Sequence, residues 1–450
     1  MKKIITLFAL STLLFFVACE DRSDLTAPTA PNTGDADFTR FVSIGNSLTA
    51  GYQSGSLYES SQVYSFGKII ADQVGTTYEQ PLISEPGIPG KLELHDLTPT
   101  IIANSELGSL LNSTYAAPYN NLGVPGAILY DLIDETGFTA KSAARENPYF
   151  SIVLRDAAFG ASIVKQALNL QPTFITLWIG NNDVLGYATS GGTTGTDPAT
   201  GKLPTDVPTF TYLYNQVALA LTDTTGHRKI AVANIPDVQN IPFFTTVGPK
   251  LSASLEAMGV PAMVYQSTHT GMGFGVATTA DLKNGNVLLT LTGSGATAYL
   301  GDRSGAYYAM NNIAVPTGVV TDSAFGFSPY NPWPDKFTLE PAEITIAQAA
   351  TTNLNKVISD VATANTKTWV LVDINSFFDD VADGGIMIDG INFTTSFILG
   401  NTFSLDGVHP TTRGYAIIAN EFISAINGKF KSSISKVNVS SYPASISLNN

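Results

Sequence analysis

Short apolar runs alternate along this chain with longer segments in which apolar residues recur at helical spacing. The alternation is seen at residues 41–44 and 63–74, 162–170 and 173–180, 211–222 and 229–236, and 341–364 and 368–374. Strands that are apolar throughout and are separated by amphipathic helices predict a parallel β-sheet covered by helices on both faces. In such a sheet, ligands bind beyond the carboxyl ends of the strands.

Two regions depart from this alternation. Residues 186–207 are rich in glycine, threonine and proline, which predicts a long loop. Residues 239–337 show strand-like pieces and an aromatic, proline-rich stretch without a clear succession of helices and strands. We interpret them as an insertion into a domain at 38–428, serving either as a lid or binding loop or as a surface elaboration. Residues 429–450 are expected to form an irregular or strand-forming C-terminal tail.

The N-terminus has the layout of a bacterial lipoprotein signal. Two lysines precede an apolar run that is shorter than the ~20 residues a membrane-spanning helix needs, which predicts a cleaved signal peptide at 1–18. Cys19, the only cysteine, follows a sequence that resembles a lipobox, although Phe16 stands where that motif usually has leucine. The alternative is an ordinary secretory signal with an incidental cysteine. The polar, proline-containing residues 19–37 predict a flexible tether.

Composition narrows the classes of partner. With 44% hydrophobic and 13% charged residues, the chain can bury a large core and is not disordered. A formal net charge of -14 argues against binding nucleic acid or anionic membranes through a basic surface. Residues 195–202 do not fit a phosphate-binding P-loop, and the scattered histidines predict no metal centre. We therefore predict no cofactor and no metal, while a structural Ca²⁺ ion in an acidic loop stays open.

A serine that cleaves esters needs a base, a carboxylate that orients the base, and donors for the developing oxyanion. Ser47 follows the apolar run 41–44, so it is expected at the carboxyl end of a strand. Taken alone, a serine after a glycine turn is weak support for catalysis. Its surroundings also differ from the GxSxG elbow, because position 49 is threonine.

The other requirements can be searched for in the same way. Asp406 precedes His409 by three residues, which allows the carboxylate to lie beside the imidazole while the other ring nitrogen faces Ser47. The alternative is a helix cap next to a surface histidine. Asn182 follows another apolar strand, and Gly126 allows a backbone N–H to approach a substrate closely. An asparagine-rich turn and a Gly-Pro loop are the alternatives for these two.

Together these segments resemble the GDSL or SGNH hydrolase family. Its four blocks occur in order as GNSLTAG at 45–51, NNLGVPGA at 120–127, IGNND at 179–183 and DGVHP at 406–410. The resemblance implies a three-layer α/β/α flavodoxin-like fold with a central parallel sheet, and the activity of a serine acyl-ester hydrolase. It further implies Ser47 as the nucleophile, His409 as the general base and Asp406 as the acid that orients it. The oxyanion hole would comprise the N–H groups of Ser47 and Gly126 and the side chain of Asn182.

One position departs from the family pattern, since Asn46 stands where aspartate usually precedes the nucleophile. Residues 79–90 and 371–386 resemble lipoprotein members from Bacteroidota. Together with the lipobox at Cys19, they predict a lipid-anchored esterase or lipase of the bacterial cell envelope, at the outer membrane. The substrate is expected to be a small-molecule, lipid or carbohydrate ester, which leaves a carbohydrate acetylesterase open. A catalytically silent surface-binding protein on the same scaffold is a second hypothesis. Aromatic residues such as Phe325, Phe327, Tyr330 and Trp333 are expected either to contact the substrate or to pack the insertion's own core.

Overall fold

The computed structural model of the chain describes residues 31–95, 101–193 and 202–444. The chain divides into two units, Met1–Pro31 and Asn32–Asn450, and the description below concerns the second. The predicted signal peptide 1–18, Cys19 and most of the predicted tether lie outside the described residues. Within the described part, we find no helix whose length and apolarity would let it span a membrane.

A five-stranded parallel sheet forms the centre of the second unit, in the order β11-β6-β5-β1-β4. Its strands are β1 (Phe41–Gly45), β4 (Asn121–Gly123), β5 (Phe174–Trp178), β6 (Lys229–Ala233) and β11 (Trp369–Val372). Every residue of β1, β4 and β5 is buried, as expected for strands covered on both faces. The predicted α/β class with a central parallel sheet is confirmed.

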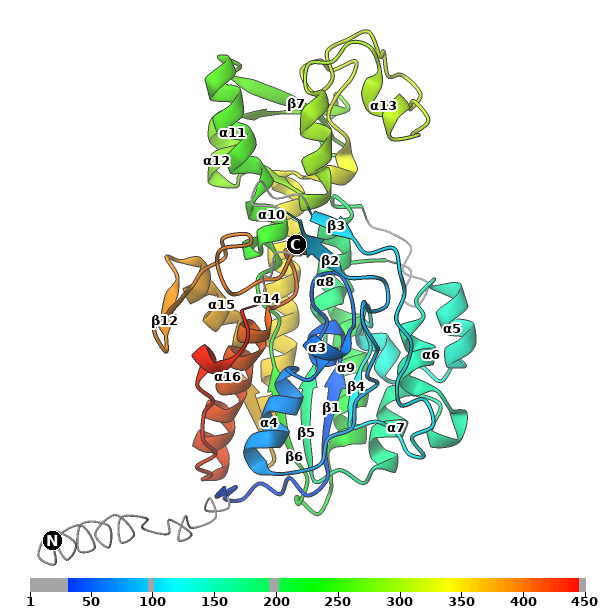
Figure 1. The fold of residues 1–450 in the computed structure, drawn as a ribbon, viewed down its shortest axis with the longest axis vertical. Coiled ribbons are helices and arrows are strands. Elements are labelled where there is room, and N and C mark those ends of the chain that lie inside the picture. The colour runs from blue at the N-terminus through cyan, green and yellow to red at the C-terminus, as the bar shows by residue number, and fades with distance from the viewer. Residues whose placement is uncertain (1–30, 96–100, 194–201, 445–450) are drawn as a thin grey trace, which may run out of the picture. The chain divides into compact units, whose positions relative to one another are not determined.

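Helices cover both faces of this sheet (Figure 1). Helix α4 (Phe66–Val74) packs against α16 (Thr412–Phe430), where Phe66 stacks on Phe422 with ring centroids 4.7 Å apart. On the other side, α9 (Val207–Leu221) contacts α7 (Ile163–Asn169) and α14 (Pro341–Ala364). Their apolar residues therefore face the sheet, as their spacing in the sequence indicates.

Smaller elements connect and flank these layers. The helices are α2 (Ser47–Ala50), α3 (Glu59–Gln62), α5 (Phe138–Ala144), α6 (Tyr149–Leu154), α8 (Asn181–Thr189) and α15 (Ile374–Ala382). The 3-10 helices are η2 (Leu129–Leu132), η3 (Ala157–Phe159), η4 (Val238–Asn240), η6 (Asp335–Phe337) and η7 (Val439–Ser441). Two antiparallel hairpins pair β2 (Leu92–Leu94) with β3 (Ile101–Ala103) and β12 (Ile386–Ile388) with β13 (Ile391–Phe393).

The loop predicted from Gly186 onward is wrong at its start. Helix α8 continues to Thr189, because Val184, Tyr187 and Ala188 lie on one face of the helix and are all buried. This burial outweighs the poor helix propensity of Gly186. Residues 194–201 of the predicted loop lie outside the described part.

The region predicted as an insertion contains a second hydrophobic core, formed by buried residues between Val247 and Trp333. The elements of this region are α10 (Pro242–Thr245), α11 (Val247–Met258), β7 (Ala262–Gln266), β8 (Phe274–Thr278), α12 (Thr279–Asn284), β9 (Leu288–Leu289), η5 (Leu291–Tyr299) and α13 (Ala306–Met310). Strand β10 (Thr338–Leu339) follows the region and pairs with β9. Figure 1 shows β7, α11, α12 and α13 gathered at the top of the view. Phe325 and Trp333 are buried in this core, whereas Tyr330 is exposed. The two buried rings therefore pack the insertion itself.

Candidate active site

Ser47 is the first residue of the short helix α2, directly beyond the carboxyl end of β1. Asn46 caps this helix, because its Oδ1 accepts a hydrogen bond from the N–H of Leu48 at 3.0 Å. The side chain of Ser47 is 7% exposed. The cap fixes the turn, and the hydroxyl is therefore held at the end of the strand, where ligands bind in parallel sheets.

Ser47, His409 and Asp406 form a continuous line of hydrogen bonds. The Oγ of Ser47 lies 2.8 Å from Nε2 of His409, although the two residues are 362 positions apart in the sequence. On the other side of the ring, Nδ1 of His409 lies 2.9 Å from Oδ2 of Asp406. This is the order of groups in which a carboxylate orients an imidazole and the imidazole accepts the proton of a serine.

Backbone donors hold the carboxylate of Asp406 in place. Its Oδ1 accepts from the N–H groups of Val408 and His409 at 2.9 and 2.8 Å, and its Oδ2 accepts from the N–H of Gly55 at 2.8 Å. Burial alone would raise the pKa of Asp406, but the charge of His409 and these hydrogen bonds lower it below its usual range. The carboxylate is therefore ionised at neutral pH and able to stabilise an imidazolium.

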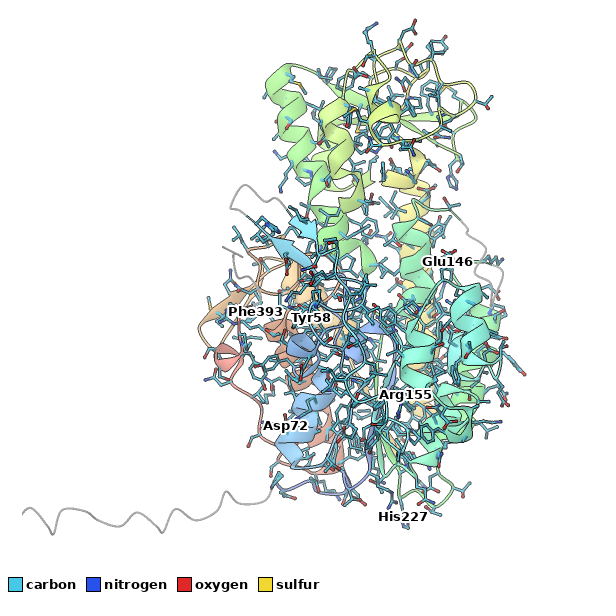
Figure 2. All side chains as sticks on the ribbon, turned by 45° about the vertical axis from the view of Figure 1, so that its right-hand side comes forward. Tyr58, Asp72, Glu146, Arg155, His227 and Phe393 are labelled. Atoms are coloured by element: carbon cyan, nitrogen blue, oxygen red, sulfur yellow. The ribbon has the colours of Figure 1, made fainter. Side chains whose placement is uncertain are left out.

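The other histidines of the described chain do not reach Ser47. His95 and His227 are exposed, and His269 lies in the insertion between β7 and β8. His227, labelled in Figure 2, precedes β6 and therefore lies at the amino end of the sheet, away from the strand ends that carry Ser47. Among the described histidines, only His409 forms a hydrogen bond with the serine.

Asn46 links the turn that carries Ser47 to the start of helix α8, which follows β5. Its Nδ2 donates to Oδ1 of Asn181 at 3.0 Å, and both side chains are buried. The sequence assigned no role to Asn181, although its position in the IGNND block was a signal that could have found it. An aspartate at position 46 would accept a hydrogen bond from the amide of Asn181 instead, so asparagine at this position reverses the polarity of the contact and keeps the link.

The residues predicted for the oxyanion hole follow β1, β4 and β5, which are neighbours in the sheet. Nδ2 of Asn182 donates to the carbonyl of Ala127 at 2.9 Å, and its second hydrogen remains for another acceptor. Gly126 is exposed and has φ of +77°, a conformation that favours glycine. Within the described part, neither the N–H of Ser47 nor that of Gly126 donates to another protein group. The three groups thus follow the carboxyl ends of neighbouring strands, and Asn182 lines the same cavity as Ser47.

A narrow cavity of about 50 Å³ adjoins Ser47 and His409. Its walls are mainly apolar and include Leu48, Leu185, Val238, Ile241, Phe378 and Phe403. A second cavity of about 950 Å³ reaches Asp406 and is lined by residues of α10, α11 and η5. The insertion therefore supplies one wall of a cavity that borders the candidate active site.

Two contacts of the site were not foreseen from the sequence. Gly55 binds Asp406 through its N–H, and Tyr52 places its ring 4.6 Å from that of His409. Both residues lie shortly after the GNSLTAG block, in a region without a recognisable motif. Comparison of the chain with protein-family models, curated proteins and solved structures yields no match.

Proposed function

We propose that this protein is a serine ester hydrolase with the layout of the GDSL or SGNH family, acting through Ser47, His409 and Asp406. The observation that carries the proposal is the hydrogen-bonded line from the serine through the imidazole to an ionised carboxylate. The central parallel sheet and the oxyanion donors at neighbouring strand ends support it. A protein that only binds ligands gains nothing from this order of groups.

The proposed reaction is an acyl transfer in two steps. His409 takes the proton of Ser47 through Nε2 while Oγ attacks the ester carbonyl, and Asp406 stabilises the imidazolium. The N–H groups of Ser47 and Gly126 and the amide of Asn182 hold the negative oxygen of the tetrahedral intermediate. Its collapse breaks the bond to the alcohol, which leaves with the proton of His409. Water, deprotonated by His409, then attacks the acyl-serine, and Ser47 regains its proton as the acid departs.

A fluorophosphonate probe separates this proposal from a catalytically silent binding protein. Such a probe reacts with a serine hydroxyl only when a neighbouring base activates it. We expect the wild-type chain to be labelled at Ser47, and the label to be found on that residue by mass spectrometry. Lack of labelling in correctly folded protein would favour the binding protein.

Replacing Asn182 with alanine is expected to reduce kcat by about 100- to 1,000-fold, because one preorganised oxyanion donor is lost. KM should change little, since this hydrogen bond strengthens in the transition state. Steady-state kinetics with p-nitrophenyl butyrate measure both constants. Asn215→Ala is the matched control, because Asn215 also donates from its side chain to a backbone carbonyl, on the exposed surface of α9. Parental kcat in Asn182→Ala would remove this residue from the oxyanion hole.

The size of the narrow cavity predicts a preference for short acyl chains. A volume of about 50 Å³ leaves little space for an acyl chain. We therefore expect kcat/KM to be highest for esters with short acyl chains and to fall for longer chains. Leu48→Ala removes part of one wall and should shift the optimum to chains longer by about two carbons.

A series of p-nitrophenyl esters from acetate to laurate measures this preference. Leu219→Ala, which changes an exposed leucine on α9, is the control and should leave the optimum unchanged. An unaltered optimum in folded Leu48→Ala would show that the acyl group binds elsewhere, and the larger cavity that borders Asp406 would be the next candidate.

The lipid anchor at Cys19 and the location at the outer membrane stay predictions of the sequence, because residues 1–30 lie outside the described part. If the anchor is present, the residues after Cys19 connect it to the catalytic unit. The enzyme would then act on esters at or near a membrane surface.

A further inference from the structure

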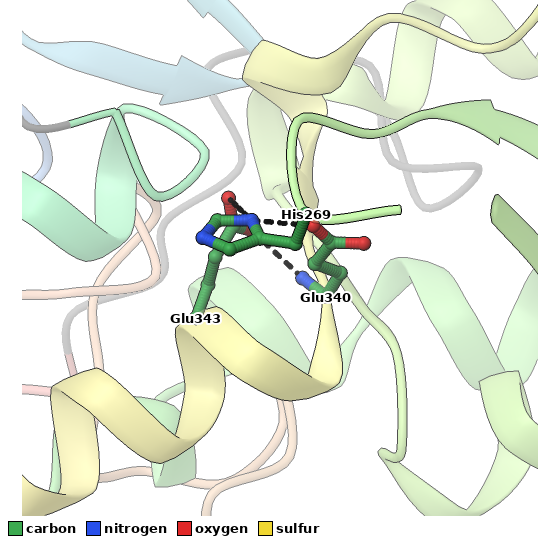
Figure 3. A group of neighbouring side chains, drawn as sticks. All are labelled: His269, Glu340 and Glu343. Atoms are coloured by element: carbon green, nitrogen blue, oxygen red, sulfur yellow. Dashed lines mark hydrogen bonds and ion pairs between the residues drawn. The ribbon is translucent and has the colours of Figure 1, made fainter. Parts of the chain in front are cut away.

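Away from the candidate active site, a histidine of the insertion meets two glutamates at the start of helix α14 (Figure 3). Nδ1 of His269 lies 2.6 Å from Oε1 of Glu340 and 3.5 Å from Oε1 of Glu343. The three ligand atoms that these side chains offer all lie within 4.8 Å of one another. One imidazole nitrogen and two carboxylates are thus directed at the same point.

Neighbouring groups hold both carboxylates in their orientations. The hydroxyl of Ser267 donates to Oε1 and Oε2 of Glu340 at 2.9 and 2.7 Å. The N–H of Glu340 donates to Oε2 of Glu343 at 2.9 Å, which leaves Oε1 of Glu343 toward His269. Carboxylates that bind metal ions are commonly oriented by such a second layer of hydrogen bonds.

The cluster carries buried negative charge. The side chains of Glu340 and Glu343 are 4% and 1% exposed, and in the described ranges no lysine or arginine pairs with either. The partly exposed imidazole of His269 faces these carboxylates, and on its own it does not balance them.

A second observation comes from helix α8. The hydroxyl of Tyr187 is buried and has no hydrogen-bond partner within the described part of the chain, and the side chain is 1% exposed. Helix α8 packs against α14, and burial together with the negative charges of Glu343, Glu340 and Asp335 raises the pKa of the Tyr187 hydroxyl. The backbone of Gly192 packs closely against the cluster, because a Cβ on this residue would lie only 2.0 Å from Cδ of Glu343. A buried polar group without a hydrogen-bond partner costs free energy. An ion that carries a bound water molecule at this point would supply that partner.

We propose that His269, Glu340 and Glu343 bind a divalent transition-metal ion of the Zn²⁺ type. Histidine nitrogen and glutamate oxygen bind Zn²⁺ at about 2.0–2.2 Å, which in a tetrahedral site separates ligand atoms by about 3.4 Å. Nδ1 of His269 lies 2.6 and 3.5 Å from the two glutamate oxygens, and all three ligand atoms lie within 4.8 Å of one another, so side-chain rotations would bring them to this value. Three protein ligands leave one position for water, which could hydrogen-bond Tyr187. The imidazole ligand disfavours Ca²⁺, which prefers oxygen throughout.

Such an ion would fasten the insertion to the core. His269 lies in the connection between β7 and β8, whereas Glu340 and Glu343 begin α14. Helix α14 contacts α8, which carries Asn182, and η4, which contributes Val238 to the narrow cavity. The ion would therefore fix the insertion relative to elements that form the candidate active site. This inference is independent of the proposed ester hydrolysis, because the binding of the ion is measured without a substrate.

Isothermal titration calorimetry tests the site directly. The purified chain is freed of metal with a chelator and titrated with Zn²⁺, Mn²⁺ and Ca²⁺ in separate experiments. We expect one equivalent of Zn²⁺ to bind, with a rise in melting temperature, and Ca²⁺ to bind more weakly than Zn²⁺. Absence of Zn²⁺ binding to the folded chain, or binding of Ca²⁺ in preference to Zn²⁺, would overturn the proposal.

Variants locate the bound ion. His269→Ala and Glu343→Gln should each weaken Zn²⁺ binding by more than about 100-fold, because each removes a ligand. Ser267→Ala should weaken it by about 10- to 100-fold through the loss of an orienting hydrogen bond. His227→Ala, which removes an exposed histidine, should leave it unchanged. Affinity that is unchanged in both ligand variants would place the ion elsewhere and contradict the assignment.

Loss of a ligand could also unfold the insertion, which circular dichroism would reveal. In that case the wild-type chain decides the question. Crystals grown with Zn²⁺ should show an anomalous difference peak between the side chains of His269, Glu340 and Glu343. An anomalous map without a peak at this point would reject the site.

Discussion

Ser47→Ala is expected to lower kcat for ester hydrolysis by about a million-fold, because the only nucleophile of the proposed reaction is removed. The fold should be unaffected. The described hydrogen bonds give Oγ of Ser47 one partner, Nε2 of His409, while the cap of α2 depends on Asn46 and not on the serine side chain. Hydrolysis of p-nitrophenyl butyrate and thermal unfolding, measured on the same preparation, separate loss of chemistry from loss of structure.

Ser424→Ala provides a matched control for this variant. Ser424 lies on α16 and donates its hydroxyl to the carbonyl of Asn420 within the same helix. Its replacement should leave both kcat and fluorophosphonate labelling unchanged. If Ser47→Ala kept the parental rate, another nucleophile would be at work and the proposed function would be wrong.

His409→Ala is expected to have an effect of similar size, because the base and the nucleophile of such a triad act as a unit. Without the imidazole, the proton of Ser47 has no acceptor, and the carboxylate of Asp406 loses the group that it orients. The substitution also leaves a space beside the ring of Tyr52. Added imidazole that enters this space should restore part of the activity, a rescue that a purely structural role would not produce.

His227→Ala is the control for this second prediction, since His227 is exposed and lies at the amino end of β6 (Figure 2). It should retain full activity. We expect Ser47 in His409→Ala to react far more slowly with fluorophosphonate than in the wild type. Labelling of this variant at the wild-type rate would exclude His409 as the base.

Much of the sheet could be predicted from local pattern. The strands Phe41–Gly45, Phe174–Trp178 and Lys229–Ala233 are apolar over nearly their full length, and this pattern leaves few alternatives to a buried strand. The extent of α8 could not be predicted, because Gly186 opposes helix formation and only the burial of Val184, Tyr187 and Ala188 overrides it. The second core of the insertion also depends on packing between segments without regular periodicity.

The candidate site, too, could be predicted from the sequence only in part. The order of the blocks around Ser47, Asn182 and His409 along the chain indicated that they belong to one site. The structure brings Ser47 and His409 into contact. The contact of Asn46 with Asn181 and the cluster at His269 could not be predicted. In both cases the partners come from segments far apart in the sequence, and no local pattern encodes their distance.

The sequence by itself determined the class of the fold and the candidate residues of the triad, because periodicity and short motifs are local properties. Only the tertiary structure decided which residues meet. Hydrogen bonds such as those that join His409 with Ser47 and with Asp406 form over a few ångströms, and the order of the strands sets which strand ends lie within that range. The same holds for His269. Glu340 and Glu343 are about seventy positions away from it along the chain, yet their carboxylates lie 2.6 and 3.5 Å from its Nδ1.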